Sequence, residues 1–389
     1  MQIDNAHILP SSSSLDIQAF SRIFKHTTNS YKLVFFRALL TTLETDRTVE
    51  INSQNLVCNM LTHAWFPAVH FKLNLGSQDM ILNTLASLNL TQVNIANSKG
   101  SPYLKVFSEV KQVLTDDVNN QLLTYVPYRL LQPFFHNELK GKPDQKKNAI
   151  TAELSITRFQ TDKPLYKIEQ CTNKKSLKLT LHPEWFEYLN NNLIIIKSWV
   201  ELNWLQYLQT KNPNSPAISN KLCLPSKREA LTNQRAFWNE LLKQESMACI
   251  FSNANLTTQN YELDHFIPWT YVAHNQYWNL LPILDAVNSS KSNHLPAKGK
   301  TVDQYVDAHY RAIILANKLQ KEKIIDDYIL VLQCSESDLF NHSVFKERFT
   351  RMLETLIDSA ALQGFQTSWI WKRPKQHTNT CIKTHHATT

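Results

Sequence analysis

Glycine occupies only 5 of the 389 positions, and this scarcity limits what the chain can fold into. Tight hairpin turns need residues that adopt a positive φ, which glycine does at the lowest cost. A fold built mostly of β-hairpins is therefore disfavoured, and a mainly α fold is expected. The chain is 43% hydrophobic and 19% charged, which is typical of a globular protein. Its length allows one large core or two to three ordinary ones.

Apolar residues recur at helical spacing through most of the chain. The tryptophans of one long helical segment, Trp185, Trp199 and Trp204, are expected to pack in a core rather than to stack on bases. A small β-hairpin is expected at 165–169 and 176–182, around a polar turn at 171–175. The helical segments expected from the pattern are 31–42, 56–65, 77–89, 103–114, 119–132, 183–208, 228–243, 301–318, 322–333 and 343–364.

Changes in composition suggest a division of the chain. The lysine-rich stretch at 140–148 is expected to be a linker or long loop, and Asn212–Pro216 to be a rigid extended connector. The regions expected are a flexible arm (1–14), a mostly helical N-terminal region for binding, sensing or regulation (15–245), a small module (246–296), a helical C-terminal region (297–371) and a basic flexible tail (372–389).

The formal net charge of +8 is mild for this length and favours a polyanionic partner only slightly. Basic clusters at Lys140–Lys147, Lys174–Lys178 and Lys227–Arg228 are candidate phosphate contacts, although solvated loops are the commoner interpretation. The N-terminus has no apolar signal core, and no apolar run is long enough to span a bilayer. No two of the six cysteines form a CxxC pair, so no zinc knuckle is expected from them. Without a signal peptide or a membrane span, a cytoplasmic protein with reduced thiols and no membrane partner is expected.

One segment, residues 248–296, carries an ordered set of polar residues. Two short strands are expected at 248–252 and 261–266, joined by a polar turn, and a short helix at 283–292. Asp264 and His265 end the second strand, just before Pro268 interrupts pairing. Asn288 and Lys291 lie one turn apart on one face of the helix. This layout would direct the groups at the strand end toward those on the helix.

The segment resembles the HNH (ββα-metal) endonuclease family, and closely the HNH domains of RNA-guided DNA nucleases and of bacterial defence nucleases. The shared residues are Asp264-His265, Pro268, Asn279 and Asn288-x-x-Lys291, and the steps of 14 positions from His265 to Asn279 and 9 from Asn279 to Asn288 are those of the family. The resemblance covers about 50 of the 389 residues. It implies a small ββα-metal module, which is then embedded in the mainly α fold that the composition and the helical pattern favour.

The resemblance also implies a role for each residue. His265 would take a proton from the water that attacks phosphorus, and its unperturbed pKa of about 6.5 suits a base at neutral pH. Asp264 and Asn288 would hold Mg²⁺ or Mn²⁺ through oxygen atoms. Asn279 would brace the loop and orient His265, and Lys291 would offset phosphate charge. The expected products carry 5′-phosphate and 3′-hydroxyl ends.

Other residues of the segment are not expected in the site. His274, Asp285 and His294 are interpreted as loop, helix-surface and helix-end residues. Many HNH modules also bind a structural zinc through paired cysteines, but here Cys249 has Ser252 in place of its partner and no second pair follows. Structural zinc is therefore not expected, and the module should rest on packing through Ile250, Leu263, Ile267, Leu280 and Ile283.

Two functions remain open from the sequence. The first is a metal-dependent endonuclease that nicks or cuts DNA, in anti-phage defence or restriction, with a regulatory or sensor protein acting through the N-terminal region. The alternative is a catalytically inactive nucleic-acid-binding or regulatory subunit with an HNH fold. The intact Asp264, His265 and Asn288 argue against the alternative. RNA is a third, less favoured substrate, and the oligomeric state is left open.

Overall fold

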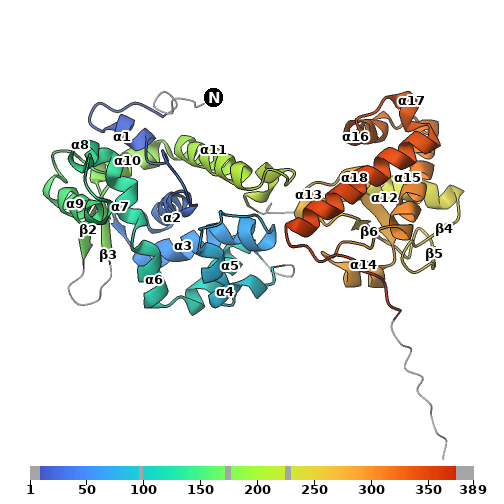
Figure 1. The fold of residues 1–389 in the computed structure, drawn as a ribbon, viewed down its shortest axis with the longest axis horizontal. Helices are drawn as coiled ribbons and strands as arrows, with labels where there is room; N and C mark the ends of the chain where they lie inside the picture. Colours follow the sequence, from blue (N-terminus) through green and yellow to red (C-terminus); the bar gives the residue numbers. More distant parts are fainter. Residues whose placement is uncertain (1–8, 96–99, 171–176, 224–228, 374–389) are drawn as a thin grey trace, which may run out of the picture. The chain divides into compact units, whose positions relative to one another are not determined.

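A computed structural model describes residues 9–95, 100–170, 177–223 and 229–373. The chain divides into two compact units, residues 1–228 and 229–389 (Figure 1). Helices dominate both units and the strands are short, which confirms the mainly α fold. Among the described residues, no helix combines the length and the apolarity needed to cross a membrane.

The N-terminal unit contains helices at the segments that the sequence predicted, and further helices that it did not predict. The expected linker at 140–148 is wrong, because a helix begins inside it at Asp144. That helix was missed because it is polar, with only Thr151 and Ser155 buried. The helices are α1 (Ile17–Ser21), α2 (Tyr31–Asp46), α3 (Ser53–Trp65), α4 (Ile81–Ser87), α5 (Pro102–Val113), α6 (Asp116–Leu123), α7 (Val126–Leu131), α8 (His136–Leu139), α9 (Asp144–Thr157), α10 (Pro183–Asn191) and α11 (Leu193–Lys211).

The expected hairpin of this unit is confirmed. Strands β2 (Tyr166–Gln170) and β3 (Leu177–Leu181) pair antiparallel, and a short strand, β1 (Glu50–Ile51), adds to the other side of β3. The polar turn predicted at 171–175 lies outside the described residues. The long-helix tryptophans are buried as predicted, and the ring centroids of Phe20 and Trp185 lie 4.8 Å apart.

Two segments of the N-terminal unit are more tightly packed than the sequence suggested. In the described part of the expected arm, Leu9 is buried and the Tyr188 hydroxyl donates a hydrogen bond to the Pro10 carbonyl at 2.7 Å. The expected connector at 212–216 is instead a packed loop. Its Asn212 side chain bonds both the amide and the carbonyl of Asn74, at 2.7 and 2.9 Å. An asparagine side chain can bond a backbone amide and a backbone carbonyl at once, so these two hydrogen bonds tie the segment to the loop at Asn74.

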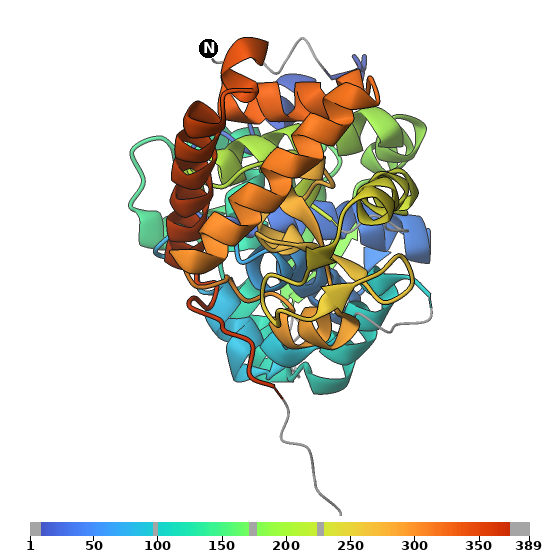
Figure 2. The ribbon, with the colours of Figure 1, turned by 90° about the vertical axis from the view of Figure 1, so that its right-hand side faces the viewer.

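The C-terminal unit joins short strands to longer helices (Figures 1 and 2). The helices expected near 301–318, 322–333 and 343–364 are all present. The elements are α12 (Thr232–Gln244), β4 (Met247–Ala248), β5 (Asn255–Leu256), β6 (Glu262–His265), α13 (Trp269–Val272), β7 (Leu280–Ile283), α14 (Asp285–Lys291), α15 (Lys300–Lys318), α16 (Glu322–Leu332), α17 (Glu336–Leu339) and α18 (His342–Leu362).

The strands of this unit pair differently from the prediction. The two predicted strands do not pair with each other: β4 pairs with β5, and β6 pairs with β7, each antiparallel. The first strand is shorter than predicted because the chain turns back after Cys249, whose backbone bonds Asn253 and Ala254, and Asn253 has a φ of 56°. Strand β7 was not expected, and it contains Pro282, which faces Leu263 across the pair.

One hydrophobic core runs from α12 through the strands to α18, so residues 246–296 do not form a unit of their own. Leu263, Ile267, Leu280 and Ile283 are buried and Ile250 is partly buried, which confirms that the segment rests on packing. The ring of Phe266 stacks on that of Tyr305 of α15 at 3.9 Å. The backbone after α18 also contacts the segment. The Leu295 amide donates to the Gln366 carbonyl at 2.8 Å, and the Trp369 amide donates to the Leu295 carbonyl at 3.0 Å.

Candidate functional site

Strand β6 positions the Asp-His pair. Its register places Asp264 opposite Leu281 and His265 opposite Leu280. Successive strand residues project to opposite faces. Asp264 is buried, with 5% of its surface exposed, whereas His265 is half-buried. The pair therefore offers a carboxylate on the protein side and an imidazole nearer the surface.

Lys291, at the end of α14, reaches the end of β6. Its ammonium lies 2.9 and 3.1 Å from the two carboxylate oxygens of Asp264 and donates to the His265 carbonyl at 2.7 Å. The side chain is fully buried. Burial raises the pKa of the Asp264 carboxyl, and the Lys291 ammonium acts against that rise. The family resemblance implied that Lys291 would lie beside phosphate. In the structure its ammonium forms an ion pair with Asp264 instead.

Asn279 is fully buried directly before β7 and braces the turn that follows His265. Its side-chain oxygen accepts from the Ile267 amide and its side-chain nitrogen donates to the Ile267 carbonyl, both at 2.8 Å. The Phe266 amide donates to the Asn279 carbonyl at 3.0 Å. These bonds fix the backbone of the two residues after His265. Asn279 is thus placed where a brace for this loop is needed.

The imidazole of His265 contacts a residue that the sequence did not single out. His265 Nε2 lies 3.0 Å from Asn275 Oδ1, and Asn275 Nδ2 donates to Glu229 Oε2 at 3.3 Å. The Gln234 side chain of α12 holds the Asn275 carbonyl at 3.0 Å. No spacing rule connects these residues with the Asp-His pair, so the sequence carried no signal for them.

A comparison with known protein families matches the segment that carries these contacts. A sequence model of the HNH endonuclease family matches residues 249–297. These residues form an HNH endonuclease module. The match contains all five predicted site residues, Asp264, His265, Asn279, Asn288 and Lys291, and it supports a nuclease function in general. Neither the curated proteins nor the solved structures that were searched contain a match to the chain.

Asn288 of the HNH module lies on α14, one turn before Lys291. It is half-buried, and in the described part of the chain its side chain has no hydrogen-bond partner. The side-chain amide oxygen of Asn288 and the Asp264 carboxylate are hard oxygen ligands, which fit Mg²⁺ or Mn²⁺. A metal ion at Asp264 would have to displace the Lys291 ammonium from the carboxylate, or share the carboxylate with it.

Few side chains of the described residues could act together as metal ligands. In the described residues, no group of three or more histidine, cysteine, aspartate or glutamate side chains could hold a metal ion. A site made of Asp264 and Asn288 would therefore leave most coordination positions to water and to the phosphate, as is usual for magnesium.

The three residues that the sequence left outside the site have other contacts. His294 Nδ1 lies 2.7 Å from the Lys291 carbonyl, at the end of α14. The His274 ring packs at 5.3 Å from that of Trp278, and Asp285 is exposed in the first turn of α14. None of these contacts places a side chain beside Asp264.

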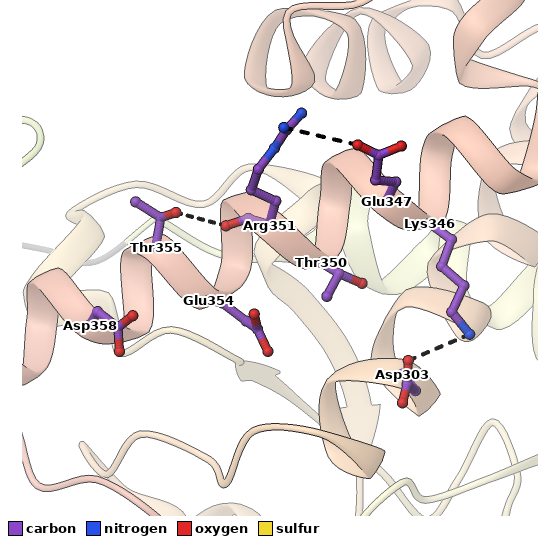
Figure 3. Close-up of a pocket in the computed structure, with 8 residues that line it drawn as sticks. All are labelled: Asp303, Lys346, Glu347, Thr350, Arg351, Glu354, Thr355 and Asp358. Carbon is purple, nitrogen blue, oxygen red and sulfur yellow. Dashed lines mark hydrogen bonds and ion pairs between the residues drawn. The ribbon is translucent and has the colours of Figure 1, made fainter.

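Figure 3 shows a groove on α18 and the neighbouring end of α15 that contains none of the predicted site residues. Its charged side chains largely pair with each other: Lys346 lies 3.4 Å from Asp303, and Arg351 lies 3.9 Å from Glu347. Mixed and mutually paired charge of this kind does not select one sign of ligand. The groove therefore adds nothing to the HNH site.

The three basic clusters that the sequence offered as phosphate contacts are described only in part. Lys227–Arg228 and most of Lys174–Lys178 lie outside the described residues, and Lys178 pairs with Glu50 at 3.0 Å. Lys147 lies 3.2 Å from Asp144, at the start of α9. Lys147 and Lys178 thus each have an acidic neighbour, whereas Lys140, Lys142 and Lys146 are exposed.

Proposed function

We propose that this chain is a metal-dependent endonuclease that hydrolyses phosphodiester bonds of DNA, with His265 as the general base. One observation carries the proposal beyond the family match. Lys291 bonds both Asp264 and the His265 backbone, so it ties the end of β6 to the last turn of α14. Asn288 lies on that same helix, one turn earlier. The residues proposed for hydrolysis thus lie on two elements, β6 and α14, that the Lys291 side chain joins.

The proposed chemistry uses the chain's own residues for proton transfer and orientation. The His265 imidazole removes a proton from a water molecule as the water oxygen bonds to phosphorus. The bond from phosphorus to the 3′ oxygen breaks, and that oxygen takes a proton from solvent, which leaves 5′-phosphate and 3′-hydroxyl ends. Asn279 keeps the loop after His265 in place. A Mg²⁺ or Mn²⁺ held by Asp264 and Asn288 would supply positive charge for the leaving oxygen.

DNA is the substrate that the family resemblance and the net charge of +8 favour together. A cytoplasmic role in anti-phage defence or restriction rests on the resemblance of the segment to such nucleases, and we include it in the proposal. The N-terminal unit has no catalytic motif of its own. We assign it the binding of a regulatory or sensor partner, because a nuclease acting on DNA needs restraint in its host.

Cleavage of supercoiled plasmid tests the proposal. With Mg²⁺ or Mn²⁺ the intact chain should nick or linearise the plasmid, and His265→Ala should be slower by a factor of about 10² to 10⁴, the usual contribution of a general base. His294→Ala is the matched control, because it removes an imidazole of the same module that faces the Lys291 carbonyl.

Two results would count against the proposal. Equal cleavage by the wild type and by His265→Ala would show that this histidine is not the base. Binding without cutting, on DNA and RNA and with either metal, would favour the inactive nucleic-acid-binding subunit instead.

A further inference from the structure

The ring of His265 has two nitrogen atoms, and only one of them can act as the base. A neutral imidazole carries one hydrogen, and its position decides which nitrogen can take a proton. The neighbours of the ring therefore matter as much as the ring itself. In this chain those neighbours include Asn275 and, behind it, Glu229.

The chemistry of these neighbours determines where the hydrogen lies. An ionised carboxylate only accepts hydrogen bonds, so Glu229 requires the NH₂ group of the Asn275 amide to face it. The amide oxygen of Asn275 then faces His265, at 3.0 Å from Nε2. That oxygen also only accepts, so Nε2 must donate. In the neutral ring Nδ1 is then the nitrogen without a hydrogen.

The backbone around Asn275 is held in place by separate contacts. The Gln234 side chain donates to the Asn275 carbonyl at 3.0 Å, and the amide of Tyr277 donates to Asp327 of α16 at 3.3 Å. The Trp278 indole bonds Gln276 at 2.7 Å. The loop that presents Asn275 is therefore braced from α12, from α16 and from within itself.

We propose that Asn275 and Glu229 are positioning residues that hold His265 in the form with hydrogen on Nε2, so that Nδ1 is the nitrogen that takes the proton from water. This inference rests on the proposed function for its catalytic meaning, but the position of the hydrogen can be measured without any activity. A bond that fixes the form of a catalytic imidazole can be decisive, because the other form presents the wrong nitrogen.

The first experiment measures the hydrogen directly. Nitrogen-15 NMR of the full chain with labelled histidine, at a pH where the ring is neutral, distinguishes the two forms, and His265→Ala identifies the His265 signals among the 14 histidines. The wild type should show hydrogen on Nε2. Asn275→Ala should give a mixture of both forms. Hydrogen on Nδ1 in the wild type, or an unchanged form in Asn275→Ala, would overturn the inference.

The second experiment exchanges the two partners. Asn275→Asp alone sets a carboxylate against that of Glu229, and Glu229→Gln alone lets the Asn275 amide turn over. The double variant N275D/E229Q restores a donor facing an acceptor, because the new amide at position 229 can donate to the new carboxylate at position 275. That carboxylate can in turn accept from Nε2, so hydrogen on Nε2 should return in the double variant. Glu245→Gln, which removes an exposed carboxylate paired with Arg311 in the same unit, is the charge-matched control.

Cleavage rates give the readout specific to catalysis. At saturating DNA, Asn275→Ala should lower kcat by about 10- to 100-fold with little change in KM, and the double variant should exceed both single variants. If the wild type cuts and His265→Ala does not, but Asn275→Ala keeps full kcat, the positioning role is wrong and the proposed function stands. If the wild type cuts nothing, the proposed function fails, while the NMR result still decides the role of Asn275.

Discussion

Lys291 and Asp264 form an ion pair in which both side chains are buried, with 0% and 6% of their surface exposed. A pair so far from water is held by its own attraction and hydrogen bonds, because neither charge has solvent to stabilise it. The Lys291 ammonium also donates to the His265 carbonyl at 2.7 Å. The pair therefore supports the fold of the HNH module and, at the same time, occupies the carboxylate proposed as a metal ligand.

Breaking this pair from the lysine side should destabilise the C-terminal unit strongly. Lys291→Met leaves the Asp264 carboxylate buried without its partner, at an expected cost of about 3–5 kcal/mol. Calorimetry of the full chain measures the loss. Lys298→Met is the matched control, since Lys298 pairs with Asp358 at the surface and should cost less than about 1 kcal/mol. Equal losses of stability in Lys291→Met and Lys298→Met would show that the buried Lys291–Asp264 pair stabilises the unit no more than a surface pair does.

The same variant tests whether Asp264 is a metal ligand. With the ammonium removed, a divalent ion can neutralise the carboxylate, so Mg²⁺ should raise the unfolding temperature of Lys291→Met more than that of the wild type. The double variant D264N/K291M has no charge to neutralise and should show no such rise, although it should recover much of the lost stability. An equal response of all three proteins to Mg²⁺ would exclude Asp264 from the metal site.

Asn279 is expected to act through the backbone. Asn279→Ala leaves the buried amide and carbonyl of Ile267 without partners, at an expected cost of about 2–5 kcal/mol for the two groups. Asn255→Ala, at an exposed position on β5, should change the stability by less than about 0.5 kcal/mol. Denaturant unfolding compares them. Wild-type stability in Asn279→Ala would mean that water replaces both hydrogen bonds.

The candidate site could be proposed from the sequence because its residues stand in the order and at the spacing of the HNH family, which the segment resembles. Asp264, His265 and Asn288 could be picked out by type and order, and the strand and helix that carry them were placed within about two residues. The long helices were predictable for a similar reason, since their apolar residues recur with one period. In each case the signal lies within one short stretch of sequence.

What the sequence missed depends on contacts between distant residues. Asn275 and Glu229 lie 10 and 36 positions from His265, and nothing in their local sequence marks them as its neighbours. Lys291 was expected beside phosphate because of the family resemblance. Lysine is seldom buried, and only the tertiary position of Asp264 explains its burial here. Strand β7 was not expected either, and its Pro282 cannot donate a backbone hydrogen bond.

Acid should weaken the C-terminal unit through His309, which the proposed chemistry does not use. Its fully buried ring lies 2.6 Å from the Tyr328 hydroxyl and packs against the rings of Trp238 and Tyr305. Burial lowers the pKa of His309 from its usual 6.5 to about 3. Between these values the unfolded chain binds a proton that the folded chain does not, so unfolding becomes easier as the pH falls. The stability present above pH 6.5 is lost progressively toward pH 3.

Replacing the ring isolates this effect. His309→Phe fills the same space without a titratable group, and the double variant H309F/Y328F also removes the hydroxyl that would lose its partner. Hydrogen exchange of α15 and α16, followed by mass spectrometry and corrected for the intrinsic effect of pH on exchange, reports the local stability. Wild-type protection should fall between pH 7 and pH 5 by about 2 kcal/mol more than that of the double variant, since each pKa unit corresponds to about 1.4 kcal/mol. Parallel losses in both proteins would show that the acid sensitivity arises elsewhere.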